Sequence, residues 1–117
     1  MLKHDGIGNK GHFWNVPGGE PEGTEDLHEA LQREFSEETG LKIAVGQLLC
    51  INEFKASPLH AVEYYFEVRK LGGSELLGHD PENVSVLSKL DWLGKEGFSN
   101  LEAETKPGFL IKYLKFD

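Results

Sequence analysis

The sequence predicts a mixed α/β domain in which helices cover a β-sheet. Residues 25–39 carry an amphipathic helical pattern, with the apolar residues of one helix face at Leu27, Ala30, Leu31 and Phe35. Three β-rich segments follow this helix, and a second helical pattern closes the chain. The order α, β, β, β, α is typical of helices packed on a sheet. At 117 residues, the chain is expected to form a single domain spanning residues 1–117.

The segment before the helix is rich in turn-forming residues. Residues 1–13 combine several charged and histidine side chains with three glycines, which predicts an exposed loop. A Pro-Gly-Gly sequence at residues 17–19 is a strong turn signal. Thr24 is positioned to cap the start of the helix, because its hydroxyl can accept a hydrogen bond from the first turn. Gly40 is expected to end the helix in the left-handed conformation.

Residues after the helix favour β-structure. Residues 41–54 and 60–71 are rich in β-branched and aromatic side chains, and the first of these segments is one strand or a pair bent at its central glycine. A loop at residues 72–83 precedes an alternating, half-buried strand at residues 84–93. Residues 106–116 return to helical spacing, so we expect a C-terminal helix that docks on the domain.

Composition and charge restrict the classes of partner. The net charge of −8 disfavours nucleic-acid polymers and anionic membranes, although a local cation still allows a small nucleotide to bind. Cys50 is the only cysteine, so neither an intramolecular disulfide nor a cysteine-rich zinc site is expected. The sequence contains no long apolar run and does not open with a secretion signal. We therefore expect a soluble, cytoplasmic protein.

Three glutamates crowd the second half of the predicted helix. At about 100° per residue, Glu34 and Glu38 lie on the same stripe as the core-facing leucines, and Glu37 borders that stripe. A solvated acidic face would point away from the apolar stripe. These side chains also sit near the helix C-terminus, where the macrodipole disfavours anions. The cluster therefore needs a compensating positive charge.

A divalent metal ion would supply that charge. Arg33 can reach neighbouring glutamates, but one arginine does not neutralise the whole cluster. Carboxylate oxygens without histidine or cysteine select hard cations such as Mg²⁺, Mn²⁺ or Ca²⁺. The glycine turn before the helix can bring bare backbone to the same place. A magnesium site is the arrangement that these residues favour.

The same residues resemble the Nudix box, the signature of the Nudix hydrolases. The box extends from Gly19 to Leu41 and keeps both characteristic spacings. Its matching positions are Gly19, Glu25, Arg33, Glu34, Phe35, Glu37, Glu38, Gly40 and Leu41. The resemblance implies an α/β/α sandwich with a mixed β-sheet. It also implies hydrolysis of a nucleoside diphosphate linked to another group, with Mg²⁺ or Mn²⁺ as the cofactor.

Roles for individual box residues follow from this resemblance. It implies that Glu34, Glu37 and Glu38 bind the metal and that the Gly19 carbonyl completes the metal shell. Arg33 would orient the glutamates, and Glu34 or an acid outside the box would activate water. The residues expected to carry catalysis are therefore Arg33, Glu34 and Glu37. Glu25 would support the loop or reach the metal through water.

Three residues are candidates for contact with the substrate. Trp14 can stack on a nucleobase, or it can pack in the core. The backbone at Gly18 can present an amide to phosphate, or it can form an ordinary turn. Glu82 lies in the loop where the family often holds an additional acid, and its alternative is a solvated loop position.

The N-terminal stretch departs from the family pattern. Family members usually carry a β-strand before the loop that leads into the box, whereas only residues 1–3 precede that loop here. A sheet short of one strand, an incomplete N-terminus and a strand supplied by a partner are all open. An exposed strand edge invites pairing, which is compatible with a homodimer. The alternative to a hydrolase is a catalytically inactive Nudix-fold module that binds a nucleotide or a protein.

Overall fold

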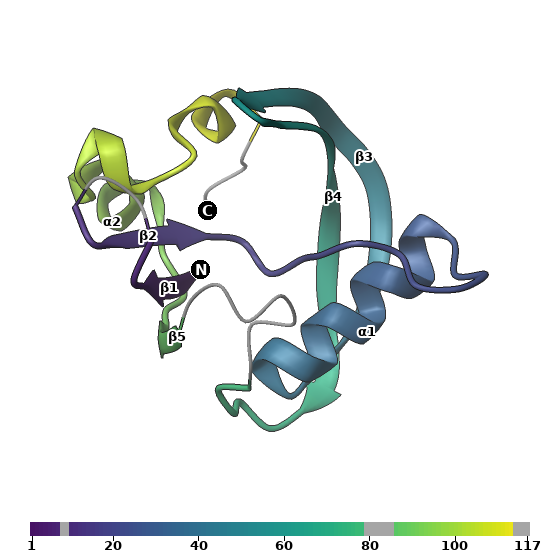
Figure 1. Ribbon diagram of the computed structural model, residues 1–117. Coiled ribbons are helices and arrows are strands. Elements are labelled where there is room, and N and C mark those ends of the chain that lie inside the picture. The colour runs from purple at the N-terminus through teal and green to yellow at the C-terminus, as the bar shows by residue number, and fades with distance from the viewer. Residues whose placement is uncertain (8–9, 79–85, 114–117) are drawn as a thin grey trace.

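A computed structural model of the chain describes residues 1–7, 10–78 and 86–113 (Figure 1). Within these ranges it contains five strands, two α-helices and two short 3₁₀ helices. In chain order these are β1 (Leu2–Asp5), β2 (His12–Asn15), α1 (Leu27–Thr39), β3 (Leu41–Ala56), β4 (Leu59–Gly73), β5 (Val86–Leu90), α2 (Lys95–Asn100), η1 (Ala103–Thr105) and η2 (Gly108–Lys112).

The first sheet joins the N-terminal strands to a strand from late in the chain. Its order is β2-β1-β5, and both pairings are antiparallel. Leu2 lies opposite Asn15 on one side and Leu90 on the other, and its side chain is fully buried. The prediction of an exposed loop over residues 1–13 is therefore wrong for residues 2–5 and 12–13, which form strands. Each of these strands is only four residues long, and β1 has a single apolar residue, so the local pattern did not indicate the pairing of β1 with β5.

The second sheet is a long two-stranded ribbon formed by β3 and β4. The pairing is antiparallel and runs from Leu41 opposite Gly73 to Ala56 opposite Leu59. Of the two alternatives left open for this segment, the structure has one continuous strand, and its register shifts between Val45 and Leu48, around the central glycine. Apolar residues along much of the ribbon stay exposed, because α1 covers only part of it.

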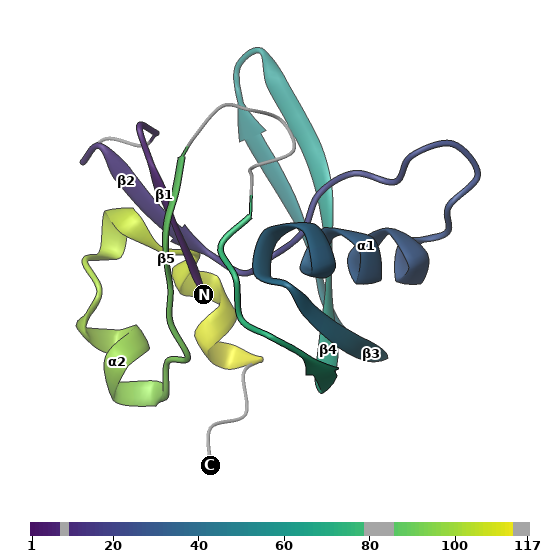
Figure 2. The same cartoon turned by 90° about the horizontal axis from the view of Figure 1, so that it is seen from below.

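Helix α1 packs on the start of β3. Phe35, Leu41 and Ile43 form a buried cluster, and the partly buried Leu31 and Val45 pack against it. Figure 2 shows the two halves of this arrangement, with β1, β2 and β5 together on one side and α1 with the ribbon on the other. The connection between β2 and α1 crosses from the first half to the second (Figure 1). This crossing brings the glycine turn to the inner face of α1.

The α/β class is confirmed, with one difference in the sheet. Every strand pairing within the described ranges is antiparallel, so the parallel pairing of a mixed sheet is not found there. Helix α2 and the 3₁₀ helix η1 lie beside the three-stranded sheet (Figure 1). Phe109 of η2 contacts Tyr65 of the ribbon edge-to-face, with ring centroids 5.4 Å apart. The 3₁₀ segments thus help to join the two halves.

The C-terminal region differs from the predicted α-helix. Its described part forms η1 and η2, and the sequence pattern did not reveal α2. Pro107 and Gly108 interrupt the helical spacing, so only short 3₁₀ turns form and Leu110 supplies the buried contact. Residues 114–117 of the predicted helix lie outside the described residues. Within the described ranges, every helix is too short or too polar to cross a lipid bilayer.

Candidate metal and phosphate site

Helix α1 has well-formed caps at both ends. Asp26 is the N-cap, and its side chain accepts a hydrogen bond from the Glu29 amide at 2.8 Å in a complete capping box. Thr24, the predicted cap, lies two residues before this position, inside a turn that the Glu25 amide closes onto the Glu22 carbonyl. Gly40 ends the helix with a left-handed φ of 73°, as predicted.

The inner face of α1 carries two buried carboxylates. Glu34 is 2% exposed and Glu38 is 1% exposed, on the face that also buries Ala30. The predicted inward direction of these two side chains is confirmed. Burying an ion costs several kcal/mol unless other groups replace its water. Oε2 of Glu34 has no hydrogen-bond partner, so one lone-pair-bearing oxygen is held in the interior without a donor.

The glycine turn packs directly against these carboxylates. A Cβ atom at Gly19 would lie 2.6 Å from both Cδ and Oε1 of Glu34, so a side chain at this position would displace the carboxylate. The Gly18 amide donates a 3.3 Å hydrogen bond to Oε1 of Glu38. The loop therefore reaches both buried glutamates through its backbone. In this structure the Gly18 amide faces a carboxylate, the position in which the sequence suggested a phosphate.

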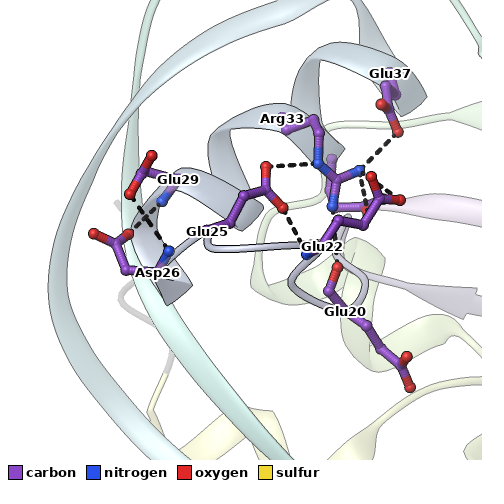
Figure 3. A network of polar contacts seen from close by, with 8 residues as sticks. Glu20, Glu22, Glu25, Asp26, Glu29, Arg33 and Glu37 are labelled. Atoms are coloured by element: carbon purple, nitrogen blue, oxygen red, sulfur yellow. Dashed lines mark hydrogen bonds and ion pairs between the residues drawn. The ribbon is translucent and has the colours of Figure 1, made fainter.

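Arg33 is the centre of an ion-pair network on the flank of α1 (Figure 3). Its Nε donates to Glu25 at 2.8 Å, and its Nη1 lies 2.8 Å from Oε1 of Glu34 and 3.1 Å from Oε2 of Glu37. Glu22 is a more distant partner at 3.7 Å. The hydrogen bond to Glu25 and, next, the contacts with Glu34 raise the pKa of Arg33 above its usual range.

The same network stabilises the loop before the helix. Nη2 of Arg33 donates to the Glu20 carbonyl at 3.0 Å, and Oε1 of Glu25 accepts from the Glu22 amide at 2.8 Å. The hydrogen bond from Arg33 is the main reason that the pKa of Glu25 is lowered. The sequence left two roles open for Glu25, supporting the loop or reaching the metal through water. Its contacts with the Glu22 amide and with Arg33 agree with the first role. The sequence did not reveal Glu20 and Glu22 as partners of Arg33. Glu20 contributes only its backbone carbonyl, and Glu22 is an exposed acid, so neither position has a recognisable sequence pattern.

Glu37 differs from the two buried glutamates. Its side chain is 48% exposed and is turned toward Arg33 on the flank of the helix. Among residues 1–7, 10–78 and 86–113, no group of three or more His, Cys, Asp or Glu side chains is already placed to hold one metal ion. Of the three glutamates predicted as ligands, Glu34 and Glu38 are therefore buried on one face of α1, whereas Glu37 is directed toward Arg33.

The donor set fits a hard divalent cation. The two buried carboxylates supply oxygen ligands only, and the orphaned Oε2 of Glu34 is the kind of atom that such an ion satisfies. The charges agree with this. The single positive charge of Arg33 is shared among four carboxylates, those of Glu22, Glu25, Glu34 and Glu37. A divalent cation would balance part of the remaining negative charge.

The predicted substrate contacts lie in different environments. Trp14 in β2 is only 7% exposed, which favours core packing over stacking on a base. Gly18 is exposed beside the carboxylates, as described above. Glu82 lies outside the described residues.

Comparison with known proteins agrees with this geometry. The profile of the NUDIX domain matches residues 1–110. The chain is also similar to diphosphoinositol polyphosphate phosphohydrolase 3-alpha of Homo sapiens, with 36% identity over 83 residues. That alignment covers 71% of this chain and 48% of the human protein, so the chain matches about half of that relative's length. With the domain profile matching nearly its whole length, the chain belongs to the NUDIX domain family.

Proposed function

We propose that the chain hydrolyses the pyrophosphate linkage of a small nucleoside diphosphate derivative with the help of Mg²⁺ or Mn²⁺. The observation that carries this proposal is the inward-facing pair on α1. Glu34 and Glu38 are both buried, and the Oε2 atom of Glu34 makes no hydrogen bond. A fold does not keep such an oxygen in its interior without a compensating interaction.

Glu34 and Glu38 would hold the cation from the inner face of α1. Glu37 and the carbonyl of Gly19 are the next candidates, because one follows on the same helix and the other belongs to the glycine that touches Glu34. When bound, a divalent cation neutralises phosphate oxygens and lowers the pKa of bound water. Pyrophosphate is polyanionic, so an acidic site of this kind attracts it only when the cation is present.

The chain's own residues prepare the geometry. Arg33 contacts Oε1 of Glu34 at 2.8 Å, which holds the carboxylate while its buried Oε2 keeps no hydrogen-bond partner. Gly19 lets the loop backbone approach the same carboxylate. Oε2 of Glu34 is thus available either to bind the cation or to accept a proton from the attacking water. Phosphoryl transfer depends mainly on such positioning and charge neutralisation, so no covalent nucleophile is required.

Two classes of substrate are considered. The glutamate set is suited to a diphosphate linked to any leaving group, and a nucleoside diphosphate derivative is our first choice. The name of the human relative points to a diphosphate carried by an inositol polyphosphate. Both classes contain the same phosphoanhydride bond, so the test includes both.

The test measures release of phosphate, pyrophosphate or a monophosphate from a panel of compounds. The panel contains nucleoside di- and triphosphates, nucleotide sugars, dinucleoside polyphosphates and a diphosphoinositol polyphosphate, each with Mg²⁺, with Mn²⁺ and with EDTA. We expect metal-dependent turnover of at least one compound. The variant Glu34→Gln should lose at least about a hundredfold in rate, the scale of a general base.

The same variant separates the two roles of Glu34. Loss of turnover with metal binding retained assigns it as the base, whereas loss of both assigns it as a ligand. Nucleotide binding without turnover across the whole panel would replace the hydrolase proposal with the alternative of an inactive binding module.

A further inference from the structure

The segment that follows β4 packs against the C-terminal end of α1. The Leu76 amide donates to the Thr39 carbonyl at 2.8 Å, and the Gly78 amide donates to the Glu38 carbonyl at 2.9 Å. The last four carbonyls of an α-helix have no partners within the helix. Residues 74–78, which we name the brace, therefore satisfy two of these carbonyls from a distant part of the chain.

The brace leaves no room for a side chain at Gly78. A Cβ atom there would overlap the carbonyl oxygen of Glu37, and it would lie 2.8 Å from the carbonyl carbon of Glu37 and 3.3 Å from Cα of Glu38. All three neighbours are backbone atoms, so rotation of a side chain does not relieve the contact. A methyl group at this position has to push the last turn of α1 away from the brace.

A second close approach lies at the same junction. A Cβ atom at Gly40 would overlap the carbonyl oxygen of Ser74, and it would lie 3.2 Å from Cβ of Leu76. Gly40 also has a positive φ, so its conformation alone favours glycine. The absence of a side chain at Gly40 thus allows the backbone of Ser74 to approach the end of α1 closely.

The turn held by the brace is the one that carries the acidic residues. Glu37 and Glu38 lie in the last turn of α1, where the carbonyl ends of the helix dipole repel negative charge. Two amide donors at these carbonyls reduce that repulsion. The brace therefore acts on the position of the carboxylates and on the local field in which they sit.

We infer that Gly78 is a positioning residue for the metal-binding end of α1. It acts through the backbone of Glu37 and Glu38 and does not itself touch metal or substrate. This inference rests on the proposed function, because it presupposes that the glutamates bind a divalent cation. It goes beyond the box, since Gly78 lies 38 residues after Gly40, the last glycine of the box.

The test compares Gly78→Ala with Gly72→Ala. Gly72 lies in the same part of the chain, and a Cβ atom there meets nothing within 4 Å. Mn²⁺ binding is measured by the loss of the electron paramagnetic resonance signal of free Mn²⁺, without substrate. We expect Gly78→Ala to weaken Mn²⁺ binding at least about tenfold, the scale of a modest coupling energy, and Gly72→Ala to stay within about twofold of wild type.

Turnover against Mn²⁺ concentration separates positioning from general damage. At saturating Mn²⁺, Gly78→Ala should recover most of the wild-type rate, because the cation pulls the displaced turn back into place. Equal Mn²⁺ affinity of Gly78→Ala and wild type would overturn the inference and leave the proposed function intact. Failure of the wild-type protein to bind Mn²⁺ would overturn both.

Hydrogen exchange gives a second test that needs no variant. If the brace and the cation act on the same turn, binding of Mg²⁺ to wild-type protein must slow exchange of the Leu76 and Gly78 amides. We expect slowing by at least about threefold relative to the amide of Val62, far along the ribbon. Unchanged relative exchange at saturating Mg²⁺ would overturn the inference even where Gly78→Ala fails to fold.

Discussion

Replacing Glu38 by glutamine should make the metal-free protein more stable. Side chains four residues apart on a helix lie about 5–6 Å from each other, so Glu34 and Glu38 are close neighbours in the interior. At roughly 6 Å and an effective dielectric constant of about 20, two unit charges repel by about 3 kcal/mol. Arg33 contacts Glu34 at 2.8 Å and offsets part of this repulsion, so we expect a net gain of about 1–2 kcal/mol.

This gain should be visible as a rise in melting temperature. Unfolding entropy of about 2.1 cal/mol/K per residue gives about 0.25 kcal/mol/K for this chain, so the gain corresponds to about 4–8 °C. The assay is thermal unfolding at neutral pH in EDTA. Glutamine keeps the shape and an acceptor for the 3.3 Å hydrogen bond from the Gly18 amide, so the fold should stay intact.

Adding Mg²⁺ should reverse the order of the two proteins. Wild type gains stability because the cation binds only the folded state, whereas Glu38→Gln has lost a ligand and should gain little. Metal-dependent turnover should disappear in the same variant. This reversed order of the two melting temperatures is the result expected if the buried Glu34 and Glu38 bind a cation together.

Glu37→Gln is the matched control for the metal-free measurement. Glu37 lies on the same turn of α1 but is half exposed and pairs with Arg33 at 3.1 Å, so its removal should change stability by no more than about 1 kcal/mol. If Glu38→Gln is no more stable than wild type in EDTA, the argument from like charges in the interior fails. If Mg²⁺ stabilises both proteins equally, Glu38 is not a ligand.

Three further predictions concern the loop, the pH response and the cysteine. Gly19→Ala should displace the Glu34 carboxylate and lower metal-dependent turnover at least about tenfold, whereas Gly18→Ala, with nothing within 4 Å of the new methyl, should retain most activity in the same assay. The hydrogen bond from Arg33 lowers the pKa of Glu25 in the folded protein, so the charged form of Glu25 stabilises the fold. Melting curves should show wild type more stable than Glu25→Gln above the ordinary pKa of about 4.5. This advantage should disappear as the pH falls through the lowered pKa of Glu25 in the folded protein. Partial burial raises the pKa of the Cys50 thiol, so its alkylation by iodoacetamide near neutral pH should be slower than that of a free thiol. Mass spectrometry measures the rate, and a faster reaction would contradict the raised pKa.

The local part of the fold could be predicted from the sequence. Helix α1, its C-terminal glycine and the two long strands follow from side-chain periodicity and turn residues, which act over a few neighbours. The prediction for the N-terminal residues failed because their strand pairing is non-local. We expected a loop at β1, because four residues are too few to show a strand pattern. β1 becomes a strand through its pairing with β5, which follows more than eighty residues later in the chain.

The candidate site divides in the same way. The spacing of Glu34 and Glu38 required both side chains to share one helix face, and the burial of both confirms this. The direction of Glu37 was not decided by spacing, because its position at the border of the stripe allowed either side. Its contact with Arg33 on the exposed flank is a tertiary outcome.

The sequence alone determined that acidic residues of one helix turn inward and that a glycine turn precedes them, since both properties depend on local geometry. The tertiary structure decided what surrounds those acids. It placed Gly19 against Glu34, gave the loop before the helix its contacts with Arg33, and set the brace against the last turn of α1. Close approach between distant backbone segments depends on packing of the whole chain, which no local pattern encodes.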